Sequence, residues 1–323
     1  MSKVSPNEYG GCLPLEKLKD NAVNPFNAHE KMECASGRVG ILYACKEAHR
    51  NKIKIPLYLC PYVKEYLNIN GISVEEYNIN EEFCPQTVYS PDSMLLWTRY
   101  FGLNHVNAQK EVFDTWPSDQ VIVDNTQALF AKPIEGAFNV YSLRKFVGIP
   151  DGAYLIGPGI DSRKSIYDQG GSWEFLEIAA NSSNSAYSLY LDNEHGLMGR
   201  IGMGMTTREY IKGVDFEYIR KKRAENNKVI DSILHNYNEL DIENDFDTMC
   251  YPFLRNGNEQ LRKQLLKLDI YTSTWWKRTL SDDKASTFEK YLTRNLIPIP
   301  ADQRYNTDVV TKVACVIAEM IAL

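Results

Sequence analysis

The sequence predicts an α/β fold, with a large domain built on a mostly parallel β-sheet and a smaller C-terminal α+β domain. Three observations support this. The first two hundred residues alternate short apolar runs with helical patterns, which is typical of βαβ units. Several apolar runs are almost continuous, as expected for strands covered by helices on both faces. From about Asp215 a long, charge-rich helical pattern replaces the alternation.

The expected strands of the large domain are Ile53–Leu59, Ser73–Asn78, Ser93–Thr98, Gln120–Asp124, Phe138–Leu143 and Ala153–Ile156. Helices are expected between them, for example at Gly37–Asn51 and Pro61–Asn70. Residues 157–213 are rich in Gly, Ser and Asn and predict irregular connections with interspersed helix. Ligands of parallel sheets gather at the carboxyl ends of the strands, so the residues after each strand are the ones to search for chemistry.

The C-terminal part begins with an expected helix at Phe216–Tyr237. The patterns that follow predict strands at Met249–Leu254 and Ile270–Thr274, and helices at Gln260–Leu268 and Asn306–Leu323. We therefore divide the chain into a large cofactor-binding domain, residues 1–213, and a small domain, residues 214–323. A length of 323 residues fits two domains of this kind. The Trp275-Trp276 pair is interpreted as part of the small-domain core.

Composition argues against two classes of partner. Lys and Arg total 36 against 42 for Asp and Glu, a net charge of −6, which gives no general electrostatic reason to bind nucleic acid or an anionic membrane. The basic run Arg220–Arg223 is interpreted as a solvated helix face. The most apolar stretch, Val309–Leu323, is interrupted by Lys312 and Glu319 and falls short of the ~20 apolar residues that a membrane span needs.

The cysteines, histidines and N-terminus favour a reduced, cytoplasmic protein without a metal site. The seven cysteines are irregularly spaced and none forms a Cys-x-x-Cys pair. The five histidines are scattered and show no metal-ligand spacing. The first residues, Met1–Pro6, carry no apolar run of the kind found in a secretory signal.

An acid and a lysine follow two consecutive predicted strands. Asp124 closes one apolar strand, and Lys145 comes 21 residues later, just after the next. Alone, such an Asp is usually a turn or cap residue, and a loop Lys is usually solvated. Together they suit pyridoxal phosphate, which needs a lysine to hold it as a Schiff base and an acid beside its ring nitrogen. Opposite charges a few ångströms apart also favour each other's ionised form.

A phosphate-binding element precedes them. Ser36, Gly37 and Arg38 open a predicted helix, whose first backbone N–H groups and positive dipole end attract anions. Ser142, three residues before Lys145, can supply a hydroxyl to the cofactor phosphate. Seen alone, the Ser-Gly step is as consistent with an ordinary helix start. With Asp124 and Lys145 it completes the set of groups that pyridoxal phosphate requires.

These segments resemble, in order, motifs of the DegT/DnrJ/StrS-type sugar aminotransferases, members of fold type I of the pyridoxal-phosphate transferases. Ser36-Gly37-Arg38 resembles the family's Ser-Gly-Thr phosphate turn. The stretch Val121–Ala128 resembles its Glu-Asp-Ala-Ala-His/Gln-Ala segment, and Ser142–Lys145 its Ser-Phe…Lys segment. Further similar motifs are Ile55–Tyr58 with Asn70–Ile72, Arg223–Asn226 and Leu296–Tyr305.

The resemblance implies a role for each matching residue. Lys145 would bind the cofactor covalently and then move the substrate Cα proton, and Asp124 would pair with the ring nitrogen. Gln127 would lie against the ring or its 3-hydroxyl group. Ser36 and Ser142, with the backbone at Gly37 and Arg38, would hold the phosphate. Two positions depart from the family: Arg38 stands in place of the Thr, and Cys60 in place of the aromatic residue that stacks on the ring, for which Tyr62 and Tyr100 are alternatives.

The implied activity is a ping-pong transamination with small-molecule substrates. Glutamate is the implied amino donor, a nucleotide-linked keto sugar used for surface polysaccharides is the implied acceptor, and a homodimer is the implied assembly. Three alternatives stay open. One is another pyridoxal-phosphate reaction on the same scaffold, although the family's dehydratases carry His where this chain has Lys145. The second is a cofactor-binding protein without turnover that serves regulation or assembly. The third is an unrelated α/β protein in which Asp124 and Lys145 are structural.

Overall fold

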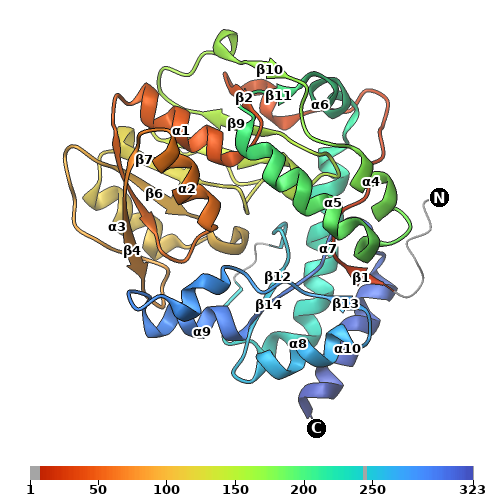
Figure 1. Ribbon diagram of the computed structural model, residues 1–323. Coiled ribbons are helices and arrows are strands. Elements are labelled where there is room, and N and C mark those ends of the chain that lie inside the picture. Colours follow the sequence, from red (N-terminus) through yellow and green to blue (C-terminus); the bar gives the residue numbers. More distant parts are fainter. Residues whose placement is uncertain (1–7, 243–245, 323) are drawn as a thin grey trace.

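An eight-stranded sheet forms the centre of the larger part of the computed structural model, which describes residues 8–242 and 246–322 (Figure 1). Its strand order is β2-β9-β8-β7-β6-β3-β4-β5. The pairs β8–β7, β7–β6, β6–β3 and β3–β4 are parallel, whereas β2–β9, β9–β8 and β4–β5 are antiparallel. The prediction of a mostly parallel sheet is therefore confirmed. The strands are β2 Met32–Cys34, β3 Lys52–Pro56, β4 Ser73–Ile79, β5 Pro85–Gln86, β6 Met94–Thr98, β7 Val121–Asp124, β8 Phe138–Ser142 and β9 Ala153–Ile156.

Both faces of the sheet are buried, which explains the continuous apolar runs of its central strands. In β6, Leu96 belongs to a buried cluster with residues of α1 (Gly37–Glu47) and α2 (Pro61–Ile69). Its neighbours Leu95 and Trp97 belong to a second cluster, with residues of α3 (Val106–Thr115). Successive side chains of a strand point to opposite faces, so β6 contributes to two cores at once.

Several elements end earlier than the sequence predicts, among them one helix and one strand of the large domain. The helix expected at Gly37–Asn51 ends at Glu47 because His49 has a φ of 51°, a left-handed conformation that an α-helix does not continue through. The strand expected at Ile53–Leu59 ends at Pro56, and the following four residues lead into α2. Leu57 still donates a backbone hydrogen bond to Tyr77 O of β4, and residues 57–60 lie at the carboxyl edge of the sheet.

Residues 157–213 contain more regular structure than expected. They form β10 (Tyr167–Asp168), α4 (Glu174–Ala179), α5 (Ser183–Gly196), β11 (Met203–Gly204) and α6 (Met205–Tyr210). The carboxylate of the buried Asp151 accepts hydrogen bonds from the backbone of Gly171 and Gly204 and from the Thr207 hydroxyl. One side chain thus ties together connections that are far apart in this segment, which local patterning does not reveal.

The C-terminal part follows the long helix α7 (Phe216–Leu234), whose N-cap Asp215 accepts a hydrogen bond from Tyr218 N. Its strands β12 and β14 form an antiparallel pair, and β1 pairs with β13 in parallel. Helices α8, α9 and α10 lie together at one end of the molecule (Figure 1). The sequence analysis did not predict α9 or β14, and Leu323, the expected last residue of α10, lies outside the described residues. The bounds are β1 Tyr9–Gly10, β12 Tyr251–Leu254, α8 Asn258–Leu266, β13 Ile270–Tyr271, α9 Thr287–Asn295, β14 Leu296–Ile299 and α10 Thr307–Ala322.

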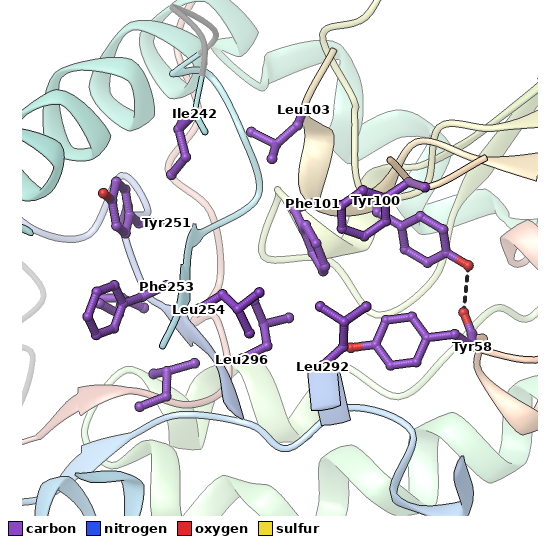
Figure 2. Packing of buried hydrophobic residues seen from close by; sticks show 14 of the residues in the cluster. Tyr58, Tyr100, Phe101, Leu103, Ile242, Tyr251, Phe253, Leu254, Leu292 and Leu296 are labelled. Atoms are coloured by element: carbon purple, nitrogen blue, oxygen red, sulfur yellow. Dashed lines mark hydrogen bonds between the residues drawn. The ribbon is translucent and has the colours of Figure 1, made fainter. Parts of the chain in front are cut away.

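One buried cluster joins the large sheet to the C-terminal elements. Figure 2 shows Tyr58 and Phe101, from the loops after β3 and β6, beside Leu292 of α9. Trp275 stacks on Phe101 with ring centroids 5.7 Å apart, and Trp276 packs edge-on against Tyr58 at 4.4 Å. The tryptophan pair therefore bridges the two parts of the chain instead of filling only a small-domain core. The domain boundary between residues 213 and 214 stays a prediction.

Three further features bear on the classes of protein considered. All seven cysteines are free thiols. No helix within residues 8–242 and 246–322 combines the length and the apolar character needed to cross a membrane. Within the same residues, no three His, Cys, Asp or Glu side chains gather in a way that could hold a metal ion.

Candidate active site

The ends of β7 and β8 lie side by side at the carboxyl edge of the sheet. Asp124 is the last residue of β7 and pairs in parallel register with Val140 of β8. Ser142 ends β8, and Lys145 closes the short 3-10 turn that follows. The prediction that these two strand ends are neighbours is therefore confirmed. Parallel pairing brings the acid and the lysine to the same edge although many residues separate them in sequence.

Thr126 connects the two charged groups. Lys145 donates a hydrogen bond from Nζ to Thr126 Oγ1 over 3.0 Å. The backbone N–H of Thr126 donates to Asp124 Oδ1 over 2.9 Å. The amine and the carboxylate therefore contact the same residue. No role for Thr126 could be predicted from the sequence, because nothing in its local pattern indicates which side chain it contacts.

Burial of Lys145 affects the pKa of its amine. Desolvation lowers the pKa of Lys145, while the nearby Asp124 carboxylate acts in the opposite direction. Asp124 is only 3% exposed, so little water screens its charge. A lysine with a lowered pKa is more often neutral near pH 7, and the neutral amine is the form that attacks a carbonyl carbon.

Helix α1 begins against this pair of strand ends. A Cβ atom on Gly37 would lie 2.8 Å from Thr126 Cγ2 and 3.6 Å from Val140 Cγ1. Only a glycine lets the first turn of α1 come so close to Thr126. Val140 and Ser142 are two residues apart in β8, so they share a face of the sheet, and Ser142 lies on the side that α1 covers.

The start of α1 carries buried polar atoms without partners. Ser36 Oγ and Arg38 Nε and Nη2 make no hydrogen bond to any residue that the structure describes. Ser36 is the N-cap residue, yet its side chain forms no capping bond. The first backbone N–H groups of a helix also lack intrahelical partners. Ser36 Oγ and these backbone N–H groups fit a phosphate group, beside which Lys145 and Asp124 fit the aldehyde and the ring nitrogen of pyridoxal phosphate.

Cys60 and Gln127, also predicted to bind the cofactor, lie nearby. Cys60 is the half-buried N-cap residue of α2 and is close enough to Lys145 and Arg38 to influence their pKa values. Gln127 is buried, and its Oε1 accepts a hydrogen bond from the backbone N–H of Phe101 over 2.6 Å. The side-chain oxygen of Gln127 therefore holds the loop after β6.

Tyr100, one of the two alternatives for the ring-stacking residue, lies in the hydrophobic cluster. Its ring is buried among other aromatic rings, 5.4 Å from that of Phe83 and 5.7 Å from that of Tyr58. Its hydroxyl donates to the backbone oxygen of Tyr58 over 2.7 Å (Figure 2). Of the two alternatives, Tyr62 is the one that lies near Arg38.

The end of α5 supplies contacts that the sequence analysis missed. Glu194 forms a bidentate ion pair with Arg144, the residue before Lys145, with one bond at 2.7 Å. His195 Nε2 lies 2.9 Å from the Tyr62 hydroxyl. Burial opposes the charge of Arg144, but Glu194 outweighs it and raises the pKa of Arg144. Glu194 is 50 residues away from Arg144 in sequence, so no local signal could have linked them.

A separate cavity of about 410 Å³ contains none of the predicted site residues. It lies between the loop after β6, the chain after β7 and helix α7, and its polar lining includes Arg99, Gln109, Lys132 and Arg220. Arg99 is held there by Gln109 Oε1, Asn125 Oδ1 and Lys132 O, and Arg220 by an ion pair with Asp247. The cavity is therefore separate from the candidate site at Lys145, although both lie at the carboxyl edge of the sheet.

The chain matches no protein-family model and no curated protein sequence. Solved structures do match it over nearly their whole length. The sugar aminotransferase CalS13 from Micromonospora echinospora superposes with a TM-score of 0.61 at 12% identity, covering 95% of this chain and 99% of that one. A DegT DnrJ EryC1 StrS aminotransferase from Brucella abortus gives 0.58 at 13% identity, covering 93% and 91%. A candidate sugar aminotransferase from Streptococcus pneumoniae in its PLP form gives 0.59 at 11%, covering 90% and 87%.

Identities this low establish the fold and leave the activity to be argued from the site. The mostly parallel sheet, the position of α1 and the C-terminal α+β elements all match the predicted fold class. The chain therefore has the fold of the DegT/DnrJ/StrS-type sugar aminotransferases, fold type I of the pyridoxal-phosphate transferases.

Proposed function

We propose that this protein is a pyridoxal-phosphate-dependent aminotransferase that aminates a sugar. The observation that carries the proposal is the convergence of Asp124, Lys145 and the start of α1 around Thr126. A carboxylate, an amine of lowered pKa and a set of unpartnered anion-binding donors are the three groups that this cofactor requires. The likeness to proteins described as sugar aminotransferases supports the same assignment.

Each predicted site residue has a role in this proposal. When bound, the cofactor acts as an electron sink for the carbon next to the substrate amine. Lys145 holds the cofactor and carries the Cα proton on Nζ. Asp124 keeps the ring nitrogen protonated. Gln127, already fixed by the Phe101 backbone, packs beside the ring, and Cys60 takes the position of the family's stacking residue.

The phosphate is assigned to the start of α1. Ser36 Oγ has no partner among the described residues, and the backbone N–H groups of Gly37 and Arg38 begin the helix. Ser142 lies on the face of β8 that α1 covers. All of these donors belong to one chain.

The substrates, the pathway and the assembly are proposed from the resemblance to the family. Glutamate would give its amino group in the first half-reaction, and a nucleotide-linked keto sugar would accept it in the second. The product would enter surface-polysaccharide biosynthesis. A homodimer in the cytoplasm, with residues 1–213 as the cofactor domain and 214–323 as the small domain, completes the proposal.

Absorbance spectroscopy of the purified protein tests the assignment. Addition of pyridoxal phosphate should give a band near the visible edge, and borohydride should bleach it while fixing the cofactor to Lys145, as peptide mass analysis would show. Lys145→Ala should lose the covalent link. Lys19→Ala, at an exposed ion pair, should keep it.

The alternative functions predict different results in the same experiment. If no band forms, Asp124 and Lys145 are structural and the cofactor assignment is wrong. If a band forms but no amino acid converts it, the protein binds the cofactor without turnover. Glutamate with a panel of keto-sugar nucleotides then tests the acceptor class.

A further inference from the structure

The Arg38 side chain is a buried cation that forms no ion pair with any residue that the structure describes. It lies in the first turn of α1, is 6% exposed, and its Nε and Nη2 have no hydrogen-bond partner within the described residues. Burial lowers the pKa of Arg38, but a guanidinium group stays protonated in proteins. Burying an unpaired charge is costly, so this site is built to receive an anion.

The neighbouring charges do not neutralise Arg38. Arg144 is close enough to lower its pKa further, and the Glu194 carboxylate near both arginines is engaged in two hydrogen bonds with Arg144. The Arg38 guanidinium lies 5.8 Å from the centre of the Tyr62 ring, and Tyr62 is held by its contact with His195. Arg38, Arg144 and Glu194 together carry a net charge of +1.

The same neighbours surround the reactive amine. Cys60, Arg144 and Glu194 are each close enough to influence the pKa of both Arg38 and Lys145. Gly37, the residue before Arg38, lies against Thr126, and Thr126 Oγ1 accepts the hydrogen bond from Lys145 Nζ. An anion paired with Arg38 would therefore lie in the same part of the site as this amine. An α-amino acid has its carboxylate one carbon away from the carbon whose proton Lys145 moves.

The proposed function assigns the cofactor phosphate to Ser36, Gly37 and Ser142, which leaves the Arg38 guanidinium for a second anion. We propose that the Arg38 side chain binds the α-carboxylate of the amino donor and so favours α-amino acids over amines that lack this carboxylate. This inference rests on the proposed function and goes beyond it, because it assigns one side chain to the first substrate.

The test compares two amines on the cofactor-loaded protein. L-Glutamate and 4-aminobutyrate share the distal carboxylate and the amine, but only glutamate carries a carboxylate on the amine-bearing carbon. The spectral change of the bound cofactor is titrated with each amine, and cofactor affinity is measured separately by titrating the cofactor-free protein. Wild type, Arg38→Gln, Arg38→Lys and the surface control Arg163→Gln are compared, since Arg163 is 88% exposed.

We expect Arg38→Gln to raise the half-saturating glutamate concentration about 30-fold, in line with the loss of a charge-assisted hydrogen-bonded pair. Half-saturation by 4-aminobutyrate and cofactor affinity should change less than about 3-fold, a loss small beside that of such a pair. Arg38→Lys should recover part of the glutamate binding, and Arg163→Gln should match the wild type.

Two outcomes would overturn the inference. If Arg38→Gln weakens cofactor binding instead, the guanidinium binds the phosphate. If glutamate and 4-aminobutyrate weaken equally, Arg38 does not read the α-carboxylate. Failure of the proposed function looks different, because the wild-type protein would then bind no cofactor at all.

Discussion

Lys145 reaches Thr126 with its side-chain nitrogen, 3.0 Å from the hydroxyl oxygen, and Thr126 in turn touches the start of α1. Its methyl carbon Cγ2 is the atom that a side chain at Gly37 would strike. One residue thus sets both the position of the lysine and the depth at which the helix docks. Mutations at this contact should therefore affect stability and cofactor binding together.

We predict that Gly37→Ala destabilises the protein by about 1–3 kcal/mol, because the added methyl group overpacks a tight contact. Cofactor affinity should fall with it, since α1 has to move away from Thr126. Thr126→Ser removes the opposing methyl group and keeps the hydroxyl that Lys145 contacts. The double variant should regain most of the lost stability in urea unfolding. Additive losses in the double variant would show that the contact is not the cause.

Asp124→Asn should lower the turnover number by about two orders of magnitude with little change in stability. The Asn side-chain oxygen can still accept the hydrogen bond from Thr126 N, so the loop keeps its shape. The charge that would hold the proton on the ring nitrogen is lost. Single-turnover rates with glutamate and urea unfolding measure the two effects. An unchanged rate would exclude Asp124 as the ring-nitrogen acid.

Glu194→Ala should destabilise the protein by about 3 kcal/mol, because it leaves the buried Arg144 without its partner. Both side chains are only 12–13% exposed. The matched control is Glu209→Ala, which breaks an ion pair with Lys212 whose members are 59–64% exposed. That change should cost less than about 0.5 kcal/mol. Equal losses in denaturant unfolding would contradict a special role for the Arg144 pair.

The stability of the protein should depend on His105 between pH 6.5 and 4. Burial lowers the pKa of His105 from 6.5 to about 4. Within this window the unfolded chain binds a proton that the folded chain does not, so folding stability falls as the pH falls. The expected loss is about 2–3 kcal/mol.

His105→Gln isolates this contribution from that of the carboxylates. Its amide can still donate to the Tyr100 oxygen that His105 Nε2 contacts at 3.1 Å, but it has no proton to gain. The difference in unfolding free energy between wild type and variant should shrink or change sign as the pH falls from 6.5 to 4. A difference that stays constant with pH would show that His105 does not titrate in this range.

The sequence by itself determined the fold class and the pair of residues, Asp124 and Lys145, on which the proposed site is built. Burial on both faces can be recognised in the sequence, because the central strands must be almost continuously apolar, as Val121, Ile122 and Val123 of β7 are. Chain direction then follows from the alternation of strands and helices. Parallel neighbours bring Asp124 and Lys145 to one edge, so their convergence could be predicted before any contact was known.

Only the tertiary structure decided which other residues meet there. Thr126 contacts Lys145 and lies against Gly37 at the start of α1, and Glu194 pairs with Arg144. These contacts join segments that are far apart in the chain. Only the three-dimensional structure shows that Nε and Nη2 of the buried Arg38 have no hydrogen-bond partner among the described residues. Local patterns record whether a residue is buried, but partners are chosen by the packing of whole elements, which no single stretch of sequence contains.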